Sequence, residues 1–360
     1  MTGGDRTGND KTAHDEAQPG QDVLDESLSR LAATGPEFGG GLSNHGPMAA
    51  EAMIRLGRPD DVEPWLDSYI QRLEDAPRAT EQITDRTWRA ALGDPRRVAD
   101  WEAYLGDQFA ENPWQEVLAR WWPRLVPGLA ASATHGIIRS SHAARSLAAT
   151  QTSERVAELA RGLAYWAATY LELPGAARTA GRLDLAAAVS GLPLAERRPA
   201  RGLITDQIRA DLADDDRFGP AVGALRPPAD VHADLLELAS TFARVFLKFG
   251  SDRPIALLHA VTAPVAARSV LPLLPAELAR PTYDALWQVD AALYAVFTPG
   301  VTPKPVPLTE PPGSETLTDR AVATGDVHAI KLTEACLRLH RESSDPILLH
   351  AAARASEMLG

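Results

Sequence analysis

The sequence predicts an all-α protein. Apolar residues recur with a spacing near 3.6 along most of the chain, Gly, Pro and Asn interrupt these runs at intervals typical of helix ends, and alternating strand-like runs are scarce. With 360 residues and a hydrophobic content of 45%, the chain can bury a large core. We expect a disordered polar tail over residues 1–21 and one compact multi-helix domain over residues 22–360.

The first half of the chain shows the helical period between clear breakers. A glycine-rich loop, Gly35–Gly41, precedes the sequence NHGP at 44–47, and Pro just inside a helix start predicts a helix beginning near Met48. His45 is therefore expected on a rigid loop at a helix N-terminus. The predicted helices of this half are Val23–Ala33, Met48–Leu56, Val62–Glu74, Gln82–Leu92, Arg97–Phe109, Trp114–Trp122 and Val126–Ala149.

The second half continues the same pattern up to a proline-rich connector at residues 298–313. We place no domain boundary at this connector, because the site residues proposed below come from both sides of it. The predicted helices are Glu154–Leu171, Ala177–Val189, Thr205–Leu212, Val231–Phe249, Arg253–Leu274, Ala276–Phe297, Ser314–Glu342 with a break near Gly325, and Pro346–Leu359.

Charge and composition exclude several classes of protein. A formal net charge of −12 argues against nucleic acid or an anionic membrane as a partner, since both select for basic faces. Cys336 is the only cysteine, so no intrachain disulfide forms. The tail has no apolar core like that of a secretory signal, and Pro264 and Arg268 interrupt the longest apolar run. We therefore expect a cytoplasmic protein.

Common cofactor and catalytic motifs are missing from the sequence. There is no Gly-Lys dipeptide for a phosphate-binding loop, no G-x-G-x-x-G after a strand and no G-x-S-x-G. The sequence thus gives no basis for a tightly held flavin or nicotinamide. The one His-Asp dipeptide, His14-Asp15, lies in the tail, which disfavours a His-Asp metallophosphohydrolase.

Histidines carry the main chemical signal of the sequence. His14 lies in the tail and His232 at a polar helix start, while His340 and His350 flank a charged turn where we expect them to be solvated. The other five have apolar or small neighbours. The nine are His14, His45, His135, His142, His232, His259, His328, His340 and His350.

Residues 131–145, ASATHGIIRSSHAAR, predict a buried helix that carries polar side chains. At about 100° per residue, His142 returns to within roughly 20° of His135, and Arg139 lies between them on the same side. We expect both imidazoles to face one metal centre. Arg139 either stabilises a substrate phenolate or peroxide as a catalytic residue or pairs with a buried carboxylate.

Two further predicted helices place histidines on small-residue or apolar faces. His259 has small neighbours on its helical face, which leaves room for an imidazole to project. His328 and Lys331 are three residues apart and share a face. A lysine on the apolar side of a helix must reach the surface, pair with an anion or lose its charge.

Each of these features also has a purely structural interpretation. A single buried histidine often hydrogen-bonds to backbone inside a helical core, although five beside Gly or Ala favour a shared polar site. Trp121, Trp122, Tyr165 and Trp166 are expected to pack in the core, the alternative being the walls of a flat aromatic pocket.

Five motifs, in this order, resemble those of the questin oxidase-like family, and the resemblance spans roughly Gly41 to the C-terminus. The motifs are NHGPM at 44–48, WWPRL at 121–125, THGIIR at 134–139 with His142, LHAVT at 258–262 and HAIKLTEA at 328–335. The resemblance implies an oxygenase that cleaves a ring of aromatic polyketides such as anthraquinones, by dioxygenation or by Baeyer–Villiger-type monooxygenation.

In one branch, the resemblance further implies a mononuclear non-haem Fe(II) held by four histidines and a carboxylated lysine, with O2 as co-substrate. The carried-over candidates are His45, His135, His142, His259 and His328, with Lys331 as the carboxylated residue. Five histidines thus compete for four places. We expect His328, the close neighbour of Lys331, to act beside the metal as a catalytic side chain.

The chemistry of a lysine next to a metal supports the same interpretation. A divalent cation repels an ammonium, whereas the neutral amine of Lys331 can react with carbon dioxide and become an anionic oxygen ligand. That anion partly neutralises Fe(II), and imidazoles suit the metal's ligand preference. Five protein ligands leave one octahedral position open for oxygen.

Two other functions fit the same residues. One is a metal-free or NADPH-assisted Baeyer–Villiger-type oxygenase, in which histidines act as general bases on a hydroquinone; NADPH has no binding motif here. The other is a non-catalytic helical binding protein for aromatic small molecules.

Overall fold

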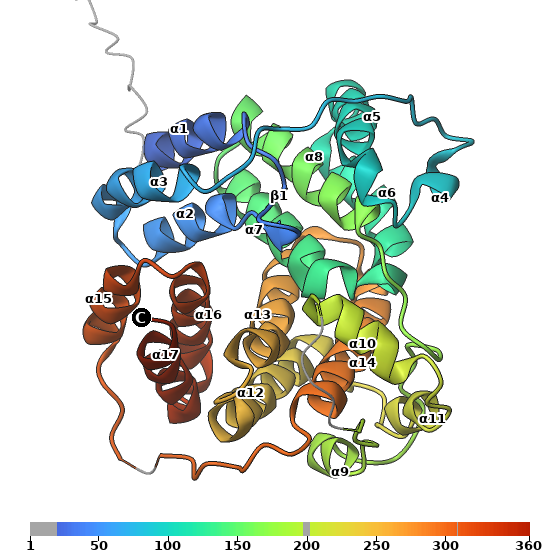
Figure 1. Ribbon diagram of the computed structural model, residues 1–360, viewed down its shortest axis with the longest axis vertical. Coiled ribbons are helices and arrows are strands. Elements are labelled where there is room, and N and C mark those ends of the chain that lie inside the picture. The colour runs from blue at the N-terminus through green and yellow to red at the C-terminus, as the bar shows by residue number, and fades with distance from the viewer. Residues whose placement is uncertain (1–19, 197–201, 308) are drawn as a thin grey trace, which may run out of the picture.

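The all-α prediction is confirmed by a computed structural model, which describes residues 20–196, 202–307 and 309–360. The described chain is built from α-helices, short 3-10 turns and one antiparallel hairpin (Figure 1). Residues 1–19 of the predicted disordered tail, including His14, lie outside the described residues.

Most predicted helices are confirmed, with shifts of a few residues at their ends. In the first half the helices are α1 Gln21–Leu31, α2 Gly46–Arg55, α3 Val62–Ile70, α4 Trp88–Ala91, α5 Val98–Glu111, α6 Trp114–Leu125, α7 His135–Ala149, α8 Ser153–Ala168 and α9 Leu185–Ser190. In the second half they are α10 Ile204–Leu212, α11 Phe218–Gly223, α12 Val231–Phe249, α13 Pro254–Val270, α14 Ala279–Phe297, α15 Ser314–Thr324, α16 Val327–Ser343 and α17 Pro346–Leu359.

Helix α13 is the centre of the arrangement, because it packs against α7, α12, α14 and α16. Helix α2 packs against both α7 and α16, so helices from the start, middle and end of the chain surround one region (Figure 1). The connector between α14 and α15 runs along the outside of the molecule. The break near Gly325 is confirmed, since Gly325 has φ 64° and ends α15.

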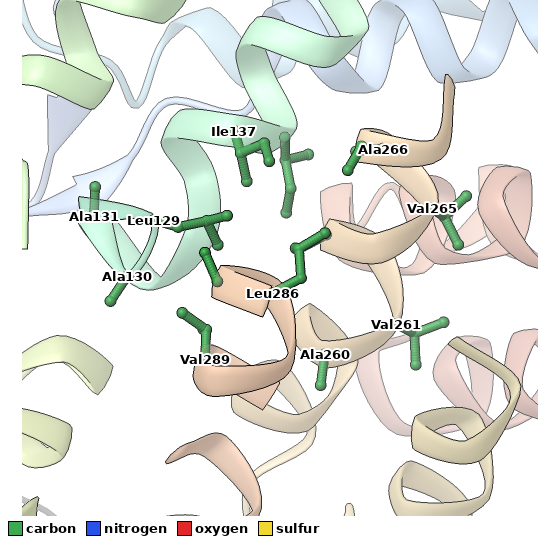
Figure 2. Close-up of a cluster of buried hydrophobic side chains, with 14 of the residues drawn as sticks. Leu129, Ala130, Ala131, Ile137, Ala260, Val261, Val265, Ala266, Leu286 and Val289 are labelled. Carbon is green, nitrogen blue, oxygen red and sulfur yellow. The ribbon is translucent and has the colours of Figure 1, made fainter. Parts of the chain in front are cut away.

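The apolar core extends from α13 to its neighbours (Figure 2). Ile137 of α7, Ala260 and Val265 of α13, and Leu286 and Val289 of α14 are all buried within it. The segment Pro254–Leu273 is the one part of the described chain that is long and apolar enough to cross a bilayer, and 78% of its apolar window is buried. That burial is typical of a core helix.

The predicted helix Val126–Ala149 is wrong in its first nine residues. Two 3-10 turns, Val126–Gly128 and Ala131–Thr134, replace it, and α7 begins only at His135. Residues 132–134 have positive φ values of 42°, 53° and 74°. Each left-handed residue of this kind costs about 1–2 kcal/mol, so tertiary contacts hold this turn against local preference.

Two other predicted helices are much shorter in the structure. In Gln82–Leu92 only α4 is helical, and Thr87 Oγ1 accepts a hydrogen bond from Thr84 N at 2.9 Å just before it. In Ala177–Val189 only α9 is helical. The residues before it pair with the chain around Leu225 instead, where Gly181 N donates to Leu225 O at 3.0 Å.

The sequence does not predict the hairpin formed by β1, Glu37–Phe38, and β2, Leu42–Ser43. The glycines at its tip, Gly39, Gly40 and Gly41, have φ values of 57°, 84° and 108°. Only glycine adopts three such conformations in succession without strain. The glycine-rich loop therefore folds as a tight turn that ends next to His45.

Asp290 of α14 generates the first testable prediction. Its side chain is fully buried, neither carboxylate oxygen has a hydrogen-bond partner among the described residues, and burial raises its pKa well above the ordinary value. A carboxyl group with a raised pKa contributes to stability only at low pH, where it is protonated. This contribution is lost as the pH rises. Asp290→Asn should therefore increase the free energy of unfolding at pH 7.5 by at least about 1 kcal/mol.

The gain from Asp290→Asn should be smaller at pH 5 than at pH 7.5, as measured by urea denaturation. An equal effect at both values would show that the carboxyl group of Asp290 does not titrate abnormally.

Candidate metal centre

His45 reaches the site from the junction between the hairpin and α2, where it is the N-cap residue. Asn44 shapes this junction, since its side chain donates to Gly35 O at 2.9 Å and accepts from Gly46 N at 3.0 Å. The backbone N–H of His45 donates to the Tyr69 hydroxyl at 2.7 Å. The rigid loop expected at this position is thus built from hydrogen bonds on both sides of the histidine.

His135 is the first residue of α7 and follows the left-handed turn directly. That turn directs the Ser132 carbonyl back to His135, where it contacts Nδ1. A carbonyl oxygen only accepts, so Nδ1 carries the proton and Nε2 keeps its lone pair. The strained backbone therefore sets the tautomer that a metal ligand needs.

His259 and His328 come from α13 and α16. His259 is fully buried, and His328 is the second residue of its helix, just after the N-cap Asp326. Asp326 accepts hydrogen bonds from the backbone N–H groups of His328 and Ala329 at 2.8 and 3.0 Å, so its carboxylate caps the helix.

The four imidazoles converge on one point. His45 Nε2 lies 2.7 Å from His135 Nε2, and His259 Nε2 lies 3.2 Å from the same atom. One ring nitrogen each of His45, His135 and His328 lies within 4.8 Å of the others. His135 has a single lone pair at Nε2, which cannot accept from both neighbours at once. A shared third atom between the rings would satisfy all of them.

Lys331 lies one turn after His328 on α16, and its side chain is 2% exposed. Its Nζ has no hydrogen-bond partner among the described residues, and the same holds for both ring nitrogens of His328 and for His259 Nδ1. Buried polar atoms without partners each cost about 1–3 kcal/mol. Their concentration at one place is the strongest structural sign of a ligand site.

Burial lowers the pKa of every basic group in the cluster. Desolvation, followed by repulsion from Lys331, lowers the pKa of His45 and His135 well below the ordinary value, and burial also lowers the pKa of His259 and His328. Burial lowers the pKa of Lys331 to about 7. Neutral imidazoles bind metals, and a neutral amine is the form that reacts with carbon dioxide.

The residues present fit a mononuclear metal. Two imidazole nitrogens that bind one ion at about 2.1 Å are separated by about 3.0–3.4 Å, which is close to the observed spacing. A carboxylate oxygen, Asp326 Oδ1, lies 3.7 Å from His328 Nδ1 and also serves as the helix cap. A nitrogen-rich site of this kind suits Fe(II), Zn(II) or Cu(II) more than Mg(II) or Ca(II).

A cavity of about 590 Å³ opens from the cluster, with all four histidines in its wall. Most of its other lining is apolar, from the hairpin, α10, α13 and α14, and includes Phe38, Leu203, Ile255 and Phe297. Arg72 and Arg253 also line it, and the Arg72 guanidinium lies 4.9 Å from the centre of the Tyr69 ring. The volume is in the range of pockets for drug-sized ligands.

His142 lies outside the cluster, contrary to the sequence expectation. Its Nδ1 is 2.9 Å from Glu51 Oε2, in a polar network with Arg145. Seven residues return a helix to the same face but advance it by roughly 10 Å, so a shared face is not a shared point. His328, which we expected beside the metal, has a ring nitrogen within 4.8 Å of those of His45 and His135 and so joins the cluster as a further candidate ligand.

Arg139 is not among the residues that line the cavity. Its guanidinium donates to both carboxylate oxygens of Glu158, at 2.6 and 2.9 Å, and both side chains are 5% exposed. Of its two expected roles, pairing with a buried carboxylate is therefore confirmed, and the catalytic role is withdrawn. His350 is buried, not solvated as expected.

The aromatic residues are core residues. Trp121, Trp122 and Trp166 are fully buried in the main hydrophobic cluster and do not line the cavity. Tyr165 is also buried, and its hydroxyl lies 2.7 Å from Ser43 Oγ. Core packing is thus confirmed over the aromatic-pocket alternative.

Sequence reasoning missed several residues that hold the site in place. Ser132 contacts His135 through its backbone carbonyl, which no residue pattern reveals. Asp326 was recognisable, because an aspartate before an apolar helical run is a common N-cap. Glu51 and Glu334 each follow a site histidine by six residues, a regularity that was visible but not interpreted.

The sequence matches no protein-family model and no curated protein. The resemblance to the questin oxidase-like family remains a prediction from the five motifs.

The geometry predicts different outcomes for two buried histidines. His259→Gln removes a cluster nitrogen and should weaken Fe(II) binding by more than about tenfold. His142→Gln should keep close to wild-type metal content, because Gln retains a donor for Glu51. Anaerobic loading followed by metal analysis measures both, and loss of metal from the His142 variant alone would overturn this assignment.

Proposed function

We propose that this protein is a non-haem iron-dependent oxygenase that uses O2 to cleave a ring of a hydroxylated anthraquinone or a related aromatic polyketide. The observation that carries the proposal is the presence of four histidines in the wall of a large, mostly apolar cavity, with an unpaired buried lysine one turn from His328. The resemblance of the five motifs supplies the substrate class.

In this proposal His45, His135, His259 and His328 hold the metal through neutral ring nitrogens. When bound, Fe(II) supplies the one-electron chemistry that allows dioxygen to react with a closed-shell aromatic ring. The helix N-termini at His45, His135 and His328 present positive dipole ends to the same point. These positive helix ends disfavour the binding of a metal cation, so the site needs an anion to offset them.

Lys331 is the residue that we propose to supply this anion. Its neutral amine forms a bond to the carbon of carbon dioxide and releases one proton, which leaves a carbamate with a negative oxygen. Four features favour this: its burial, its unpartnered Nζ, its lowered pKa and its place one turn from His328. A carbamate also removes the repulsion between an ammonium and the metal.

The cavity wall determines what the substrate must look like. Apolar side chains from four elements can enclose a flat ring system and exclude water from it. Arg72 and Arg253 provide positive charge for a phenolate or another anionic oxygen on the substrate. His328 and Asp326 also line this space.

Metal analysis combined with oxygen uptake tests the proposal. We expect wild-type protein loaded anaerobically to retain close to one equivalent of Fe(II) and to consume oxygen with a hydroxyanthraquinone or its reduced form. Retention of less than about a tenth of an equivalent would contradict it. Uptake that survives complete chelation would favour the metal-free oxygenase, and ligand binding without uptake would favour the binding protein.

Replacement of the lysine tests the carbamate separately. Lys331→Ala should lower both Fe(II) retention and oxygen uptake by more than about tenfold, since the anionic ligand is lost. A short-chain carboxylic acid should restore part of both, because it can occupy the same place. Lys248→Ala, at an exposed position on α12, is the control. Undiminished activity of Lys331→Ala without added acid would exclude the carbamate.

A further inference from the structure

A second polar layer lies behind the histidines. Arg145 of α7 donates to Glu51 of α2, with Nε to Oε1 at 2.9 Å, and to Glu334 of α16, with Nη1 to Oε1 at 3.1 Å. The exposed fractions of the side chains are 4% for Glu51, 10% for Arg145 and 5% for Glu334. One guanidinium thus bridges two carboxylates from opposite ends of the chain.

The layer has a regular relation to the metal site. Glu51 follows His45 by six residues, and Glu334 follows His328 by six. Arg338 extends the bridge to the fourth helix, since it donates to Glu334 at 3.0 Å and approaches Val265 O, six residues after His259, at 3.5 Å. Six residues of α-helix rise about 9 Å, so Glu51, Glu334 and Val265 each lie about 9 Å along the helix from the histidine that they follow.

The positive charge of Arg145 in this layer is paired with the negative charges of Glu51 and Glu334. Burial is the largest single influence and raises the pKa of Glu51 and of Glu334, but Arg145, together with His142 and, for Glu334, Arg338, lowers both overall, the second to about 2. Both carboxylates are therefore ionised at neutral pH. Buried ion pairs of this type contribute little net stability compared with apolar packing, so their effect is on geometry.

These ion pairs control the relative positions of the helices, which is the geometry that a metal site needs. A buried bridge between α2, α7 and α16 fixes how far each helix turns about its axis and slides along it, and ligands must be held within about 0.5 Å. Helices α2 and α16 are in contact, and Arg145 forms an ion pair between α7 and α16.

We propose that the Glu51–Arg145–Glu334 bridge is a positioning device that sets the separation of the histidines on α2, α7 and α16 and thereby the metal affinity of the site. This inference rests on the metal site of the proposed function. None of the three residues touches the metal or the substrate in this view; each acts through the helix that carries a histidine.

Co(II), a spectroscopic substitute for Fe(II), tests the inference through its dissociation constant and its visible absorption spectrum. We expect Glu51→Gln to weaken Co(II) binding by about tenfold or more and to change the spectrum, because one helix loses its link to Arg145. Thermal unfolding of the metal-free protein is measured in parallel.

Glu158→Gln is the matched control. Glu158 of α8 is as buried as Glu51, and it pairs with Arg139, which lies on α7 as Arg145 does. This ion pair links α7 to α8, and α8 carries none of the site histidines. The Glu158→Gln variant should lose about as much stability as Glu51→Gln. It should nevertheless keep the wild-type Co(II) affinity within about twofold and the wild-type spectrum.

The outcomes separate this inference from the proposed function. Wild-type protein that binds no Co(II) contradicts the metal site itself and with it the positioning role. Binding by the wild type with equal affinities for Glu51→Gln and Glu158→Gln overturns the positioning role alone. If Glu51→Gln does not fold, Arg145→Lys replaces it, since lysine keeps the charge but lacks the planar fork that bridges two carboxylates.

Discussion

The structure depends on the burial of five basic side chains at one place without a dedicated counter-charge. His45, His135, His259, His328 and Lys331 are each at most 8% exposed. Burial disfavours their charged forms and lowers the pKa of each, that of Lys331 to about 7. A folded protein does not gain stability from such a cluster, which is why it indicates a function.

Local strain and long-range packing cooperate to build this cluster. The left-handed turn over residues 132–134 costs free energy but directs a carbonyl to His135. The glycine hairpin brings the chain back so that His45 begins α2. Burial of α13 among four other helices holds His259 fully inside the protein. Each histidine thus has its own structural reason for its position.

The site consists of successive layers along the same helices. His45, His135 and His328 stand at helix starts and His259 in the second turn of α13. Lys331 lies one turn beyond His328, and the bridge of Glu51, Arg145 and Glu334 lies deeper along α2, α7 and α16. The cavity lies on the other side of the imidazoles. The polar side chains therefore change from a layer of buried imidazoles to a layer of paired charges.

The sequence by itself determined the features that depend on neighbouring residues. The 3.6 period predicted most helices, Pro47 placed His45 at a helix start, and the spacing of three put His328 and Lys331 on one face. These are local properties of the backbone and of side-chain direction. For the same reason, four of the five proposed histidines could be identified in advance as members of one polar site.

Only the tertiary structure decided which groups meet. Sequence periodicity gives rotation about a helix axis, but the rise along that axis separates His142 from His135, and the pairing of Arg139 with Glu158 needs a second helix. His45 and His135 are 90 residues apart, and Arg145 and Glu334 are 189 apart. Contacts over such separations arise from the packing of whole helices, which the local pattern of residues does not encode.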